Sequence, residues 1–236
     1  MSNTIKIALG VLLALVFFVP ESQAQEEGNY YTVRDLESWM GIKVKYKLNK
    51  QWGFSLEHQY RLKDNARVLD QKFTEFGIKR KIGKQFSLAV AGRYLRSNDT
   101  EGKTQGMESH FRWNTDLGHT FEIHRFTIGS RIRYQRKQEL QSEDLAEKSI
   151  RLKAGIGYNI KKWKLDPEFS TEIFNEMESL KGLDKIRFTI GTSYKLKKFG
   201  AISGFYRIEK ELVGAYPATT NIFGIKYQYT FKNKKK

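Results

Sequence analysis

The chain has 236 residues, of which 39% are hydrophobic, 14% aromatic and 29% charged, and 42 Lys and Arg against 26 Asp and Glu give it a formal net charge of +16. This length fits one domain or at most two small ones, and the aromatic content with only 3 Pro argues against a disordered chain. The absence of Cys excludes a disulfide scaffold, a thiol nucleophile and a Cys-ligated zinc.

Residues 1–24 are typical of a secretory signal peptide that is cleaved from the mature protein. Lys6 precedes an apolar run from Ile7 to Val19, Pro20 ends that run, and Ser22-Gln23-Ala24 supplies small residues before a cleavage point at Gln25. A retained N-terminal anchor is the alternative, although the run is short for a membrane-spanning helix. We therefore expect an exported domain over residues 25–236, whose basic charge meets anionic lipid, lipopolysaccharide or peptidoglycan rather than nucleic acid.

The mature sequence alternates between apolar and polar residues, which is typical of β-strands with one apolar face. Four residues interrupt the pattern: Pro167 and Gly204 fall on apolar faces, and Phe73 and Phe205 fall on polar faces. No other stretch is long and apolar enough for a transmembrane helix. The pattern predicts eleven strands: Met40–Leu48, Phe54–Leu62, Thr74–Arg80, Phe86–Arg96, Phe111–Leu117, Phe126–Gln135, Ile150–Tyr158, Leu165–Ile173, Ile186–Tyr194, Ile202–Glu209 and Phe223–Phe231.

The predicted connections alternate between short turns and longer polar loops, as in outer-membrane barrels with tight periplasmic turns. The stretch from Gly118 to Arg125 fits as one slightly long turn. If both termini are periplasmic, the number of strands is even, and Asn29–Arg34 is the candidate for a further strand. We therefore predict a single antiparallel barrel of about twelve strands, with ten as the alternative. The longer loops are expected at 63–71, 97–106, 137–147, 175–184 and 210–219.

A transmembrane barrel is favoured over a soluble one because the polar faces carry many charges of both signs and aromatic residues end the apolar rows. Phe126 and Tyr134, for example, bracket one strand. The last strand ends at Phe231 before a Lys-rich tail at 232–236, which resembles the signal read by the barrel-assembly machinery. The expected location is the outer membrane, with lipid and lipopolysaccharide as surroundings, envelope proteins as possible partners and no role for nucleic acid. A soluble periplasmic barrel that binds an apolar ligand is the alternative.

Several segments resemble the bacterial domain-of-unknown-function family 2490. They are Trp39 at the start of a strand, the Lys-Leu-Asn-Lys turn at 47–50, Leu56-Glu57 with Tyr60-Arg61, Arg131-Ile132-Arg133-Tyr134, and Phe169 with Glu172-Ile173-Phe174-Asn175. The likeness extends from about residue 36 to 231. It implies a porin-like outer-membrane barrel of Gram-negative bacteria, including the Bacteroidetes group, and it implies no activity.

The candidate site is a set of charged residues that share the predicted luminal face. Its basic members lie on strands that are neighbours in sequence, so they are expected to adjoin and to form an anion-selective constriction. The alternative is that carboxylates pair with them across the lumen. The basic members are Arg131, Arg133, Arg151, Lys153 and Arg187, and the other members are Glu57, Arg61, Glu75, Glu108, Arg112 and Glu172.

The sequence offers no pattern that predicts catalysis, a cofactor or a metal site. His110 shares a luminal row with Glu108 and Arg112, but Ser109 points to the opposite face, so the two neighbours do not form a dyad. His119 and His124 fall in the predicted turn. We therefore expect a non-enzymatic protein, either a narrow pore for small solutes or a structural or partner-binding envelope protein. An outer-membrane lipid hydrolase or acyl-modifying enzyme is the alternative.

Overall fold

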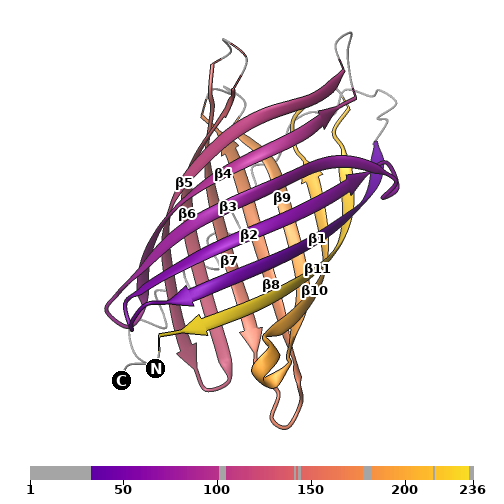
Figure 1. The fold of residues 1–236 in the computed structure, drawn as a ribbon. Helices are drawn as coiled ribbons and strands as arrows, with labels where there is room; N and C mark the ends of the chain where they lie inside the picture. The colour runs from indigo at the N-terminus through magenta and orange to yellow at the C-terminus, as the bar shows by residue number, and fades with distance from the viewer. Residues whose placement is uncertain are drawn as a thin grey trace. The chain divides into compact units, whose positions relative to one another are not determined.

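The computed structural model describes residues 33–100, 105–140, 142, 145–177, 182–214 and 216–233. The predicted signal peptide at 1–24 and residues 234–236 of the tail lie outside them. Within these ranges, no helix has the length and apolar character needed to traverse a bilayer. The described residues form eleven strands and one 3-10 turn (Figure 1): β1 (Arg34–Lys47), β2 (Trp52–Lys63), β3 (Val68–Ile82), β4 (Phe86–Asp99), β5 (Gly106–Ile123), β6 (Phe126–Glu139), β7 (Glu147–Tyr158), β8 (Leu165–Glu176), β9 (Leu183–Lys195), η1 (Lys197–Phe199), β10 (Ala201–Glu211) and β11 (Thr219–Lys232).

The strands form a closed barrel, which confirms the predicted all-β barrel fold (Figure 1). Each strand is antiparallel to the next along the chain, and the barrel closes through a parallel pair, β1 and β11, with Arg34 opposite Thr219 and Lys47 opposite Lys232. Parallel closure removes the requirement for an even number of strands, so eleven described strands stand where about twelve were predicted. Of the proposed extra strand, residues 29–32 lie outside the described residues, and Arg34 begins β1.

The strands extend beyond their predicted ends, most clearly in β5. The predicted turn from Gly118 to Arg125 is wrong, because β5 continues to Ile123 and only residues 124–125 form the turn. His119 therefore lies in a strand, opposite Phe86 of β4, and Ile123 lies opposite Phe126 of β6. Hydrogen bonding to a neighbour on each side keeps this segment extended.

The connections at the two ends of the barrel differ less in length than predicted. Residues 48–51, 83–85, 124–125, 159–164 and 196–200 join strands at one end, which we call the turn end. Residues 64–67, 100–105, 140–146, 177–182 and 212–218 join them at the other, which we call the loop end.

Side chains are sorted between the two faces of the barrel wall in the opposite sense to a soluble barrel. Large apolar side chains on the outer face are widely exposed, such as Ile42 (58%), Leu56 (51%) and Ile190 (57%). The buried polar and charged residues among those described lie on the inner face: Glu57, Gln59, Arg93, His110, Arg112, Asn114, Arg151 and Glu172. Because side chains alternate along each strand, one register places every charged row inside and every apolar row outside.

Candidate functional site

The inner face of the barrel surrounds a polar cavity of about 640 Å³, to which all eleven strands contribute. Every residue of the predicted charged set lines this cavity except Glu108. Cations outnumber anions among the lining residues, with 13 Lys and Arg against 6 Asp and Glu. The cations are Lys43, Arg61, Arg93, Arg112, Arg131, Arg133, Lys137, Arg151, Lys153, Lys185, Arg187, Arg207 and Lys226, and the anions are Glu37, Glu57, Asp70, Glu75, Glu172 and Glu209.

Glu172 on β8 is the centre of the predicted basic cluster. Its carboxylate lies 2.6 Å from Arg131, 2.9 Å from Arg151 and 3.4 Å from Arg187, and its side chain is only 6% exposed. Arg187 faces Glu172 directly on β9, whereas Arg131 lies two strands away on β6. The structure thus brings Arg131, Arg151 and Arg187 together, as expected from their neighbouring strands. It also pairs them with a shared carboxylate, as expected if carboxylates pair with the cluster across the lumen.

Arg133 of the same cluster has a different partner, Asp116 on β5. The guanidinium donates two hydrogen bonds of 2.7 Å, one to each carboxylate oxygen. This two-point geometry matches the planar fork of Arg to the two oxygens of a carboxylate. Asp116 was not among the predicted site residues, although it lies on the luminal face of β5.

Three further carboxylates each serve two cations. Glu75 lies 2.7 Å from Arg93 and 3.2 Å from Arg112. Glu57 lies 2.8 Å from Lys43 and 2.5 Å from Lys226, across the parallel closure of the barrel. Glu209 pairs with Lys185 at 2.7 Å and with Arg187. Because each carboxylate is shared in this way, the network leaves positive charge in excess.

Arg61, Lys153 and Arg207 have no carboxylate within 4.0 Å in the part of the chain that the structure describes. Arg61 donates to Gln59 Oε1 at 2.8 Å, and Arg207 donates to Thr189 Oγ1 at 2.9 Å. Arg61 and Arg207 are therefore held by neutral groups rather than by carboxylates.

Luminal aromatic rings support the guanidinium groups. Trp39 is 5% exposed and has Arg61 at 3.5 Å and Arg207 at 4.7 Å from its ring centroid. Phe73 is 2% exposed and has Arg93 at 3.4 Å from its centroid. Such contacts between a cation and an aromatic face are stabilising when they are shielded from water.

Phe73 and Phe205 interrupt the polar rows of the sequence, and that irregularity is the sequence signal for aromatic rings in the lumen. We call Trp39, Phe73, Phe174 and Phe205 with Arg61, Arg93, Arg151, Arg187 and Arg207 the arginine–aromatic layer.

Toward the turn end, small side chains of β5–β8 line part of the lumen, together with the carboxylate of Glu168. A second cavity of about 330 Å³ lies there, with Gly129, Gly155 and Gly157 in its wall. Arg131 and Lys153 line both cavities. These two cations therefore stand where the small-residue part of the lumen meets the charged part.

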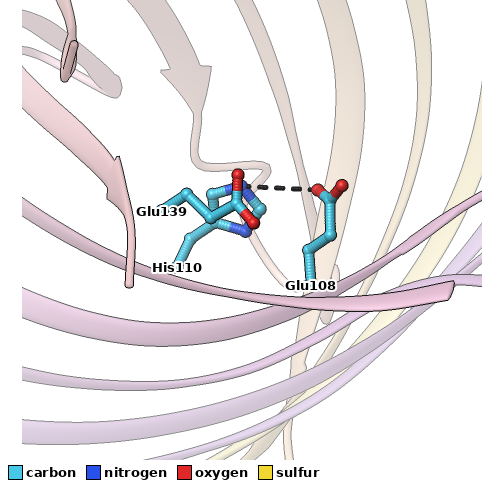
Figure 2. Close-up of side chains that lie close together, drawn as sticks. All are labelled: Glu108, His110 and Glu139. Carbon is cyan, nitrogen blue, oxygen red and sulfur yellow. Dashed lines mark ion pairs between the residues drawn. The ribbon is translucent and has the colours of Figure 1, made fainter. Parts of the chain in front are cut away.

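His110 lies near the loop end of β5, beside Glu108 and Glu139 (Figure 2). It is buried, its Nδ1 lies 3.3 Å from Ser97 Oγ on β4, and its Nε2 lies 3.7 Å from a Glu108 carboxylate oxygen. Ser109 is on the outer face, where its Oγ pairs with the Tyr94 hydroxyl at 3.1 Å. Sequence reasoning missed Ser97 because it belongs to another strand, where it is the register partner of Glu108.

Residues 36–211 match the model of a family described as a protein of unknown function (DUF2490). Searches of curated proteins and of solved structures return no match.

Proposed function

Because the chain belongs to the DUF2490 family of proteins of unknown function, we propose its role from its geometry: a non-enzymatic outer-membrane barrel whose basic lumen gives small anionic solutes a narrow path across the membrane. The excess of cations in the lumen is the observation that carries this proposal. The pathway combines a small-residue entrance at the turn end with the arginine–aromatic layer further in.

The outward apolar face supports the membrane location. Exposed rings and aliphatic side chains, such as Phe76 (51%), Val90 (49%) and Phe223 (55%), cover strands on different sides of the barrel. This is the sorting of a barrel whose outer wall contacts lipid acyl chains. Outer-membrane lipid and lipopolysaccharide would then surround the wall, and the barrel-assembly machinery would insert it.

The distribution of unpaired charge supports a preference for anions. Rings of charge that line a pore select ions of opposite sign. Lys153 has no carboxylate partner within 4.0 Å among the described residues and lies where the two cavities meet. Arg131 and Lys153 line both cavities, so an anion that moves from one cavity to the other passes these two cations.

Liposome swelling and bilayer recordings test this function. The chain is refolded in detergent and reconstituted, and swelling is measured with sugars of increasing size. We expect swelling whose rate falls with sugar size, and a reversal potential in a KCl gradient that indicates a preference for chloride. Lys153→Glu should shift the reversal potential toward K⁺, whereas Lys210→Glu, the same charge change on an exposed residue of β10, should not. Absence of swelling and of current from a correctly inserted barrel would overturn the pore and favour a structural or partner-binding role.

One observation favours a second candidate, an outer-membrane lipid hydrolase. Ser97, His110 and Glu108 form a row at the loop end in which a hydroxyl contacts an imidazole and a carboxylate lies beyond it. A nucleophile, a base and an orienting acid in contact are the parts of an acyl-transfer site. A fluorophosphonate probe tests this candidate: labelling that Ser97→Ala abolishes would support it, and absence of labelling would exclude Ser97 as an activated nucleophile.

A further inference from the structure

Strand pairing brings three residues of metal-ligating types to one point at the loop end of the lumen. Glu108 and His110 are two residues apart on β5, so their side chains project from the same face. Glu139 on β6 is the direct register partner of His110. One ligand atom from each residue lies within 4.8 Å of the other two, and Figure 2 shows the three side chains gathered together.

The imidazole of His110 is held in place for this role. The residue is only 6% exposed, and Ser97 Oγ lies 3.3 Å from Nδ1. If Nδ1 carries the proton and donates a hydrogen bond to Ser97 Oγ, Nε2 keeps its lone pair and has the Glu108 carboxylate beside it. Nε2 is 3.7 Å from Glu108 and makes no hydrogen bond in the described part of the chain. A hydrogen bond at one ring nitrogen commonly orients a histidine whose other nitrogen binds metal.

The local charge also suits a divalent cation. Two carboxylates and one neutral imidazole offer two negative charges. The nearest cation along β6, Lys137, is engaged by the exposed Glu147 of β7 at 3.1 Å. Metal binding also requires the three ligand atoms to move closer to one another, because metal–ligand bonds are only about 2.0–2.2 Å long. Rotation of the two Glu side chains can provide that movement without displacing the strands.

We propose that Glu108, His110 and Glu139 bind a divalent transition metal of the zinc class. One nitrogen and two oxygen ligands are a donor set that Zn²⁺ accepts, whereas Ca²⁺ and Mg²⁺ prefer oxygen donors alone. The three residues leave a fourth coordination position for water or a ligand that reaches the loop end of the lumen. This site is separate from the luminal cations of the proposed pathway.

Calorimetric titration of the refolded chain with Zn²⁺ tests the site, and Co²⁺ absorption reports the geometry of the bound ion. We expect one saturable site in the unaltered chain, and a loss of affinity of at least tenfold in both His110→Asn and Glu139→Gln. Glu122→Gln removes an exposed carboxylate at the opposite end of β5 and should keep the site. Each variant is first shown to migrate as a folded barrel before and after heating in detergent.

Two outcomes would overturn the proposal. One is a folded, unaltered chain that shows no saturable Zn²⁺ binding at micromolar concentration. The other is binding that His110→Asn and Glu139→Gln leave unchanged, which would assign the metal to other residues. Neither outcome bears on the pathway, because the swelling assay is carried out with a chelator present.

Discussion

At the scale of single residues, the lumen depends on carboxylates that each serve several cations, and Glu172 is the clearest case. Its three guanidinium partners belong to β6, β7 and β9, so one side chain joins four strands. Charges taken out of water are stable only while they remain paired. The energetic importance of Glu172 therefore exceeds that of any one ion pair.

Glu172→Gln should destabilise the barrel by about 3–5 kcal/mol, because it leaves buried guanidinium groups without their shared counter-charge. The measurement is urea unfolding of the refolded chain, followed by tryptophan fluorescence. Glu147→Gln is the matched control: Glu147 pairs with Lys137 but its side chain is 60% exposed, so about 0–1 kcal/mol is expected. Equal losses in the two variants would contradict the importance assigned to the buried network.

The irregular aromatic residues of the polar rows also have a local explanation. Phe205 occupies the lumen over Gly224, where a Cβ atom would overlap its ring. Its ring also meets Trp39 edge-on at 6.3 Å between centroids. The alternation of the sequence identified Phe205 as an exception, but the glycine that accommodates it lies on β11, and only the strand register joins the two.

At the scale of the strands, a period of two was sufficient to predict which residues share a face. It was insufficient to predict strand ends, because pairing with neighbours decides them, as the continuation of β5 to Ile123 shows. It was also insufficient to predict ion pairs. Arg131 and Glu172 are 41 residues apart, and their contact depends on the stagger between strands. Which residues share a face follows from their positions along one strand, whereas ion-pair partners across the lumen depend on how separate strands are staggered.

The face assignment predicts unequal effects of the same substitution at adjacent positions of β2. Leu56→Arg places a charge on the outer wall, where Leu56 is 51% exposed, and should cost about 2–4 kcal/mol in a lipid bilayer. Ser55→Arg directs the same side chain into the polar lumen and should cost much less. Unfolding of both variants in lipid vesicles provides the comparison. Equal tolerance of the two substitutions would contradict a lipid-facing outer wall.

At the scale of the whole molecule, the parallel pairing of β1 with β11 is what the sequence did not predict. An even number of strands is required only when all neighbouring strands are antiparallel, and the segment at 29–34 was needed only to reach that number. In the structure, Glu57 of β2 binds Lys43 of β1 and Lys226 of β11, so luminal ion pairs span the closure. These ion pairs thus support the pairing of β1 with β11, which the alternation of the sequence alone could not identify.

An engineered disulfide between β1 and β11 distinguishes direct pairing of these two strands from a barrel with a further strand between them. Met40 is the register partner of Ile225, and both face outward. Neighbouring strands lie about 4.8 Å apart, within the range of a disulfide, whereas an inserted strand would double that separation. The chain has no native Cys, so Met40→Cys with Ile225→Cys gives an unambiguous pair. After oxidation of the folded barrel, we expect a faster band on a denaturing gel that reductant removes.

Met40→Cys with Tyr229→Cys is the control, because four residues along a strand add about 13 Å to the separation of the two Cys residues. Cross-linking of the control pair alone, or of neither pair in a folded barrel, would refute an eleven-strand closure in this register.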